Sequence, residues 1–229
     1  MRNRLKTLFK GAVMLSLVML SSFPVFSQSG KGQQGNKNQH ERIDALDDLS
    51  FTEMINSVPL DDKSAELVRK FQDKEARDRV LKSYGMNRNG CNVETYRNKE
   101  VILITIPASK LFAPNSTELR SDASSYLSPL KRYLKDPGMY RVLIVMHTDN
   151  TGSEAYREKI TEERSTAVFD WFDNQNLDTE YLFSYAYADD MPLAENNSMS
   201  NRDKNRRLEI FLVPGEKMAE QAKKGRIVF

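Results

Sequence analysis

Two oppositely charged residues, Asp149 and Arg164, stand in positions that suit a binding or catalytic site. Asp149 follows the apolar segment 141–146, which predicts a buried strand, and α/β folds usually form their sites at the carboxyl ends of strands. Arg164 lies on the apolar stripe of the next predicted helix, which comprises Ile160, Ala167, Val168, Trp171 and Phe172. Because that helix must bury its stripe, we expect the Arg164 guanidinium to point at the sheet.

These two charges allow two interpretations. Arg164 can pair with Asp149, or with another acid, and thereby fix the helix on the sheet. Alternatively, both side chains stay open for a zwitterionic ligand such as an amino acid, because arginine offers a planar fork to a carboxylate and aspartate accepts hydrogen bonds from an ammonium group. The spacing of the residues does not decide between a structural pair and a binding site.

The first 27 residues have the pattern of a secretory signal peptide. Four basic residues are followed by the apolar segment Ala12–Leu20 and by small side chains at Val25 and Ser27. The apolar segment is much shorter than the ~20 residues of a membrane-spanning helix, which favours cleavage over an uncleaved inner-membrane anchor. Without this leader, the 34 basic residues fall to 30 against 32 acidic ones, a net charge of −2, so no nucleic acid partner is expected.

The next segments differ in composition from a folded domain. Residues 28–48 are polar and rich in Gly, Gln and Asn without hydrophobic periodicity, which predicts a flexible tether. Residues 49–86 contain one short and one longer amphipathic segment, the longer at 62–84 and followed by Gly85, and we expect a small helical extension. Residues 215–229 are expected to form a C-terminal tail.

Strand and helix patterns alternate from Cys91 onward. Residues 91–97 and 101–107 flank a short polar link and are expected to form a β-hairpin. A helical stripe interrupted by Pro129 follows, then the strand and helix described above, then two more strands. The order ββαβαββ predicts an α/β (α+β sandwich) fold over residues 87–214, with helices packed on a mixed sheet.

Three segments resemble the OmpA-like periplasmic domain, the C-terminal domain type of OmpA and MotB. HTDNTGSEAY, ITEERSTAV and MPLAENNSMSNRDKNRRLEIFLV are similar, in this order, to the three conserved blocks of the family. The upstream segment LFAPNSTEL resembles the loop that follows the family's opening strand. The resemblance covers residues 91–214 and implies the ββαβαββ fold of a domain that holds peptidoglycan non-covalently.

The resemblance also implies roles for individual residues. Arg164 would receive the free carboxylate of the diaminopimelate residue in the peptide stem, and Asp149 would receive its ammonium group. The implied binding site further includes Thr148, Asn150, Arg157, Asn205 and Arg206. No catalytic residue, metal or cofactor is expected, because the sequence has no nucleophile with its base, no Gly-rich phosphate cradle and no metal-binding spacing.

The chain departs from the family pattern at several positions. Met146 replaces the glycine ahead of HTD, and Asn201 replaces a glycine ahead of NRR. Ala186 and Ala188 replace a Gly-x-Gly on the fourth strand. Arg157 stands where the family has an asparagine that lines the pocket, a change that bears on affinity or on the choice of ligand.

We therefore expect a peptidoglycan-binding protein of the periplasm, not an enzyme, that anchors itself to the cell wall, with association to the outer membrane left open. One alternative is a periplasmic assembly or scaffold protein that binds an envelope protein through residues 49–86 and whose OmpA-like site is weakened or structural. The other is an inner-membrane stator-type anchor, which requires that the leader is not cleaved.

The leader generates a first prediction. If residues 1–27 are a cleaved signal peptide, the mature chain should begin near Gln28, because the small side chains at Val25 and Ser27 fit the specificity of signal peptidase. Intact-mass measurement on protein released from the envelope by osmotic shock tests this. A full-length species retained in the inner membrane would support the stator-type anchor instead.

Overall fold

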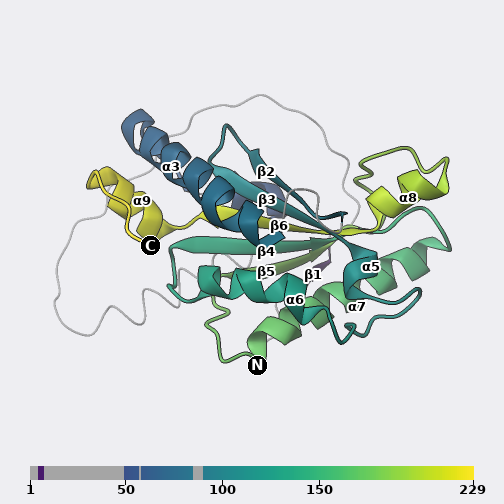
Figure 1. The fold of residues 1–229 in the computed structure, drawn as a ribbon. Helices are drawn as coiled ribbons and strands as arrows, with labels where there is room; N and C mark the ends of the chain where they lie inside the picture. The colour runs from purple at the N-terminus through teal and green to yellow at the C-terminus, as the bar shows by residue number, and fades with distance from the viewer. Residues whose placement is uncertain (1–4, 8–48, 57, 85–89) are drawn as a thin grey trace.

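The computed structural model describes residues 5–7, 49–56, 58–84 and 90–229, which build a six-stranded sheet in the order β1-β5-β4-β6-β3-β2 (Figure 1). In chain order the strands are β1 (Leu5–Thr7), β2 (Asn92–Tyr96), β3 (Val101–Pro107), β4 (Tyr140–Met146), β5 (Leu182–Ala186) and β6 (Arg207–Pro214). β1, β5 and β4 are parallel, whereas β4–β6, β6–β3 and β3–β2 are antiparallel pairs. The predicted mixed sheet is confirmed.

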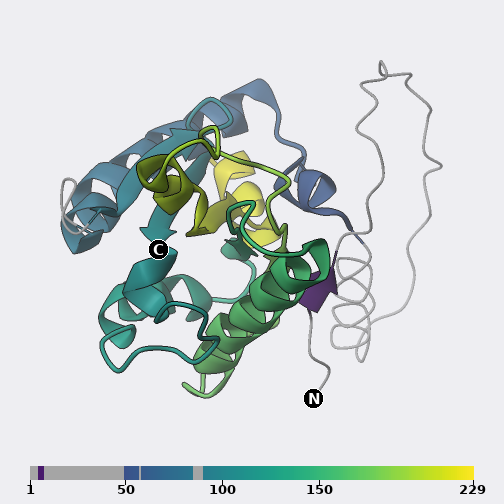
Figure 2. The ribbon, with the colours of Figure 1, turned by 90° about the vertical axis from the view of Figure 1, so that its right-hand side faces the viewer.

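One face of this sheet is covered by a layer of helices (Figures 1 and 2). α3 (Asp62–Glu75) continues through a π-helical segment, η1 (Ala76–Val80), into α4 (Leu81–Tyr84), so residues 62–84 are helical throughout, as predicted. The other helices of this layer are α6 (Ser124–Leu127), the 3-10 segment η3 (Ser128–Leu134), α7 (Glu154–Asp173) and α9 (Glu216–Lys223). Pro129 lies at the start of η3, where its missing N–H is tolerated.

The main core lies between this helical layer and the sheet. Alternate residues of the central strands face it, because successive side chains of a strand point to opposite faces. The strand residues in this core include Ile102, Ile104, Ile106, Val142, Ile144, Met146, Leu208, Ile210 and Leu212. From α7 the core receives Val168, Phe169 and Phe172. The apolar stripe predicted for this helix is therefore largely the face that it buries.

A short helix, α2 (Phe51–Asn56), packs on the opposite face of the sheet. The remaining strand residues form a second apolar cluster there, which includes Leu143, Val145, Phe183, Phe211 and Val213. Met54 of α2 is fully buried, and the Phe51 ring meets the Phe211 ring edge-on at 5.0 Å between centroids. Both faces of the central strands are thereby covered, which explains why β4 is buried along its whole length.

Residues 62–84 belong to the same packing unit as the sheet. Val68, Val80 and Tyr84 are part of the main core. Gln72, fully buried, donates to the carbonyl oxygens of Glu100 and Leu212 at 2.9 and 3.2 Å. The predicted helical extension thus shares one core with the residues that follow it.

The predicted C-terminal tail is largely structured. Residues 216–223 form α9, whose Met218 and Ala222 are buried in the main core. Beyond it, the Phe229 ring stacks on Tyr133 with 5.8 Å between centroids. The basic residues of this segment made it look like a solvated tail, but its apolar residues fall on one side of a helix.

Two earlier predictions lie outside the described residues. The leader, residues 1–27, is described only at β1, and the tether, residues 28–48, is not described at all. Within the ranges that are described, no helix combines the length and the apolar character that crossing a membrane requires.

Ala188, just after β5, generates a second prediction. Its φ is +44°, a left-handed conformation that costs an L-residue about 1–2 kcal/mol, partly offset in glycine by a larger loss of entropy on folding. Ala188→Gly should therefore raise the free energy of unfolding by up to about 1 kcal/mol, or about 2–4 °C in Tm. Differential scanning calorimetry measures this.

Ala186→Gly is the matched control. Ala186 lies within β5, where glycine costs about 0.5–1 kcal/mol, so this variant should be less stable than the wild type. If both variants lost stability equally, the left-handed conformation of Ala188 would not be a source of strain in the wild type, and the prediction would be wrong.

Candidate functional site

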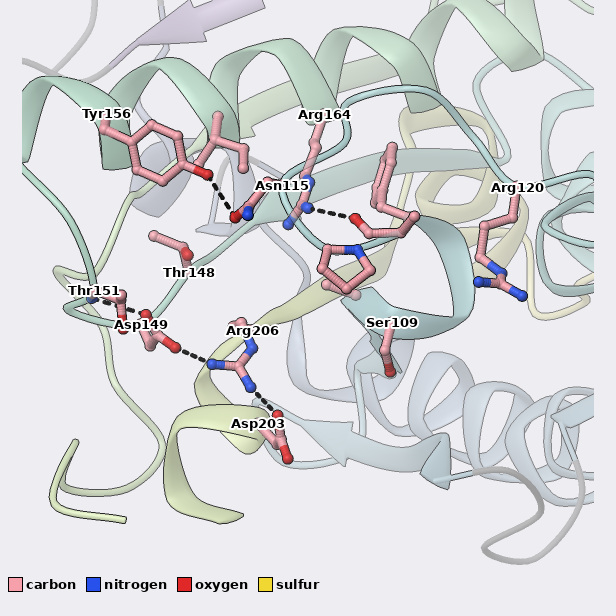
Figure 3. A pocket seen from close by; sticks show the side chains of 15 residues that line it. Ser109, Asn115, Arg120, Thr148, Asp149, Thr151, Tyr156, Arg164, Asp203 and Arg206 are labelled. Atoms are coloured by element: carbon pink, nitrogen blue, oxygen red, sulfur yellow. Dashed lines mark hydrogen bonds and ion pairs between the residues drawn. The ribbon is translucent and has the colours of Figure 1, made fainter. Parts of the chain in front are cut away.

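A cavity of about 450 Å³ opens beyond the carboxyl end of β4 (Figure 3). Three segments form its walls. They are the first turns of α7, the helix α8 (Met199–Asn205) together with Arg206, and residues 108–120, which begin with the short helix α5 (Ala108–Leu111). The lining residues are Ala108, Ser109, Phe112, Ala113, Pro114, Asn115, Arg120, Thr148, Asp149, Thr151, Tyr156, Ile160, Arg164, Asp203 and Arg206.

Arg164 reaches the cavity from the third turn of α7. It is only 5% exposed, yet no acid lies within ion-pair distance of it in the part of the chain that the structure describes. Instead, its Nε donates to the Ser116 carbonyl oxygen at 2.8 Å and its Nη2 to that of Ala113 at 3.3 Å. Its guanidinium also lies over the Phe112 ring, 4.9 Å from the ring centroid.

The charge of Arg164 is therefore balanced only by dipoles and a ring face. Burial lowers the pKa of Arg164, and the positive charge of Arg206 lowers it further, although an arginine stays protonated at neutral pH. A buried cation without a counter-ion is unfavourable, so this position gains from an anion that enters the cavity. The structural pair with Asp149, one of the two interpretations of the sequence, is not formed.

Asp149 lies in the same cavity with different partners. Its Oδ1 accepts a hydrogen bond from the Thr151 backbone N–H at 2.8 Å, and its Oδ2 pairs with Arg206. Burial opposes ionisation, but the hydrogen bonds from Thr151 and Arg206 outweigh it, so the pKa of Asp149 is lower than usual. Asp149 is thus held as a carboxylate at neutral pH.

Arg206 links two acids at the rim. One nitrogen pairs with Asp149 and another with Asp203, an exposed residue of α8 (Figure 3). The guanidinium of Arg164, which lacks a counter-ion, is thus separate from the carboxylate of Asp149. The cavity therefore offers two poles of opposite charge to a ligand.

The predicted site residues divide into two groups. Thr148, Asp149, Arg164 and Arg206 line the cavity. The other three, Asn150, Arg157 and Asn205, do not belong to its lining.

Each of these three residues has a different place. Asn150 is exposed in the turn after Asp149. Arg157 bonds Asp189 at 2.7 Å and the Gly152 carbonyl oxygen at 2.6 Å. Asn205 is fully buried and bonds residues 194 and 196 through both ends of its amide, which fixes the loop ahead of α8.

One wall of the cavity was not assigned from the sequence. Residues 108–120 supply several lining residues, and the Tyr156 hydroxyl on α7 donates to Asn115 Oδ1 at 3.0 Å across the opening. Asn115 has φ +57°, a conformation that asparagine tolerates better than most residues. The segment LFAPNSTEL carried a signal through its resemblance to a family loop, but nothing in it showed which side chains reach the site.

Fold and site together define an α/β domain with a preformed charged pocket at a strand end. Residues 111–206 match the OmpA family model, so this part of the chain is similar to the OmpA family. This confirms the resemblance in the sequence.

Known relatives support this assignment. The chain is 30% identical over 106 residues to the outer-membrane lipoprotein YfiB of Pseudomonas aeruginosa, a match that covers 46% of this chain and 62% of the relative. It is 23% identical over 119 residues to the peptidoglycan-associated lipoprotein of Mesorhizobium japonicum, covering 52% and 71%. The matches span 13% to 62% of the lengths of four curated relatives, so likeness is established for one domain.

Solved structures support the fold. A MotB-like protein from Desulfovibrio vulgaris superimposes with a TM-score of 0.57 at 23% sequence identity, over 66% of this chain and 95% of that one. At this identity the likeness extends to the arrangement of strands and helices alone.

Proposed function

We propose that this chain binds peptidoglycan non-covalently in the periplasm, through the diaminopimelate residue of the peptide stem, and so anchors itself to the cell wall. The observation that carries the proposal is Arg164, a buried guanidinium in the cavity wall with no acid to neutralise it in the described structure. A carboxylate that enters the cavity would supply the missing charge through paired hydrogen bonds.

The second pole fits the other half of the ligand. Diaminopimelate within a peptide stem keeps one free stereocentre, which carries a carboxylate and an ammonium group on the same carbon. With the carboxylate at Arg164, Asp149 is the acceptor for the ammonium group. Since Arg206 already pairs with Asp149 and with Asp203, it can keep Asp203 while Asp149 shares its oxygens with the ligand.

The names of relatives agree with this proposal without testing it. One similar protein is named peptidoglycan-associated lipoprotein, and another is named an outer-membrane lipoprotein. Both names fit a place in the cell envelope, which the predicted signal peptide also favours. The specific role of diaminopimelate rests on the resemblance to the family, and the two opposite charges of the cavity fit it.

We further propose a binding protein rather than an enzyme, because the groups in the cavity are suited to charge recognition. In the alternative function, residues 49–86 bind an envelope protein, and this remains a prediction. The apolar side chains of α3, including Val68, are turned toward the sheet and are used within the domain. The stator-type anchor depends on residues 1–27, which are described only at β1.

The zwitterion site generates a third prediction. Loss of one charge partner leaves its ligand group desolvated and unmatched, which costs roughly 2–5 kcal/mol, or about 30-fold to several thousand-fold in affinity. Asp149→Ala and Arg164→Ala should therefore both abolish co-sedimentation with sacculi that contain diaminopimelate. Arg164→Lys keeps the charge but loses the planar fork, so it should also bind poorly.

The controls separate binding from folding and from general charge. Asp78→Ala and Arg77→Ala remove exposed charges of η1 that do not line the cavity, and these variants should sediment like the wild type. Circular dichroism melting should show every variant folded. Sacculi with lysine in place of diaminopimelate keep the ammonium group but lack the carboxylate, so they should bind the wild type weakly. Equal binding to both wall types would contradict the proposed role of Arg164.

Acidification provides a fourth prediction. Because the pKa of Asp149 is lower than usual, this carboxylate stays ionised well below neutral pH, and affinity should be constant between pH ~8 and ~5. Affinity should fall only when the pH drops below the ordinary range of an aspartate carboxyl, ~4, because the lowered pKa of Asp149 delays its protonation, and the contribution of Asp149 to folding stability is lost in the same direction. Titration of a diaminopimelate peptide by isothermal calorimetry measures this. The Asp149→Asn variant should bind weakly at every pH in this range. If the affinity of the wild type already fell at pH 6, a group other than Asp149 would control binding.

A further inference from the structure

The cavity holds more positive charge than the zwitterion site uses. Three guanidinium groups line it, from Arg120, Arg164 and Arg206, against two carboxylates, from Asp149 and Asp203. Arg206 takes both of these carboxylates. In the proposed function Arg164 receives one ligand carboxylate, so Arg120 is the cation that remains.

Arg120 is held in place by the backbone around it. Its N–H donates to the Leu111 carbonyl oxygen at 2.8 Å, and an antiparallel bridge joins Phe112 to Leu119 just before it. These bonds close residues 112–119 into a loop with a fixed base. The start of the Arg120 side chain therefore has a defined position at the cavity wall.

Only one nitrogen of the Arg120 guanidinium has a bonding partner among the described residues. Its Nε lies 3.2 Å from Asp122 Oδ1, and its other two nitrogens have no bonding partner in the ranges that the structure covers. The side chains of Arg120 and Asp122 are 46% and 61% exposed, and an ion pair this exposed contributes little. Two N–H-bearing nitrogens are thus available to a ligand.

Arg120 also lies at some remove from the zwitterion site. Figure 3 shows Asp149 and Arg120 on opposite sides of the view, with Arg164 and Ser109 between them. All four residues line the same cavity. A ligand that occupied the zwitterion site and also met Arg120 would need a further polar group outside its amino-acid centre.

We infer that Arg120 forms a subsite for a second carboxylate, so that the pocket selects a peptide with one zwitterionic centre and one further free carboxylate. This inference rests on the proposed function and narrows its substrate class. Such a peptide has a net charge of −1, which matches the lining residues, three arginines against two aspartates. In a stem peptide this carboxylate comes either from the γ-linked glutamate ahead of diaminopimelate or from the carboxyl terminus of the peptide.

Three synthetic stem tripeptides test the subsite: the unmodified peptide, one with the glutamate carboxylate as an amide, and one with the terminal carboxylate as an amide. Isothermal calorimetry should show the wild type binding one of the amidated peptides about 2- to 5-fold more weakly than the unmodified peptide. The peptide that loses affinity identifies the source of the carboxylate. Arg120→Gln should bind that peptide and the unmodified one equally.

Two further variants sharpen the test. Asp122→Asn removes the competing acid and should increase affinity for the unmodified peptide, a gain that loss of folding cannot produce. Arg77→Gln removes an exposed arginine outside the cavity lining and should leave all three affinities unchanged.

The outcomes separate the two proposals. If the wild type bound all three peptides equally, the second subsite would be wrong and the zwitterion site would stand. The same holds if Arg120→Gln weakened all three by the same factor. If no peptide bound, the proposed function itself would fail, and this inference with it.

Discussion

The hydrogen bonds from Arg164 to the carbonyl oxygens of Ala113 and Ser116 determine the shape of the site. They join α7 to residues 112–119, two segments that are distant in sequence, and they do so with a cation that has been removed from water. A guanidinium can satisfy its N–H groups with carbonyl oxygens, but these dipoles do not cancel its charge. The loop therefore holds the cation rigidly and leaves it electrostatically unbalanced.

The rest of the domain keeps this arrangement in place. α7 is fixed on the sheet by Val168, Phe169 and Phe172 in the main core, and its first turn begins with Ser153 as N-cap. β4 delivers Asp149 to the same opening. The two charged groups thus come from elements that are anchored in the main core, so the pocket is held in shape by the fold and little binding energy is needed to order it.

Much of this could be predicted from the sequence because the elements have strong local signals. The hairpin, the buried strand before Asp149 and the stripe of α7 all follow the periodicity of their residues. Arg164 was identifiable because it interrupts an apolar stripe. The place of Arg157 was not, since its partner Asp189 lies in a loop whose path no periodicity reports. The way in which residues 112–119 hold Arg164 was equally hidden, because it depends on backbone carbonyls that are the same for every residue type.

The sequence also failed to show that residues 62–84 and α9 are part of the core. The apolar stripes of these two segments predict helices, but an amphipathic pattern does not indicate which surface the helix packs against. α3 lies against α9 and over β3. Its Gln72 is fully buried, and both ends of the side-chain amide are bonded, to the carbonyl oxygens of Glu100 and Leu212 and to the Tyr140 hydroxyl. Glutamine is seldom fully buried in a core. The bonds of Gln72 to the backbone of β6 and to the turn of the hairpin determine the position of α3 along the sheet.

The π-helical segment η1 has a consequence for how this helix tolerates insertions and deletions. A π turn takes about one residue more than an α turn, and the N–H of Leu81 bonds back to Ala76, five residues earlier. The extra residue allows Val68, before the segment, and Tyr84, after it, to face the same core. A regular α-helix would make these contacts with one residue fewer. A chain shortened by one residue between Ala76 and Val80 could therefore keep both contacts, whereas the same deletion in the regular part of α3 would rotate the preceding residues by about 100° out of the core.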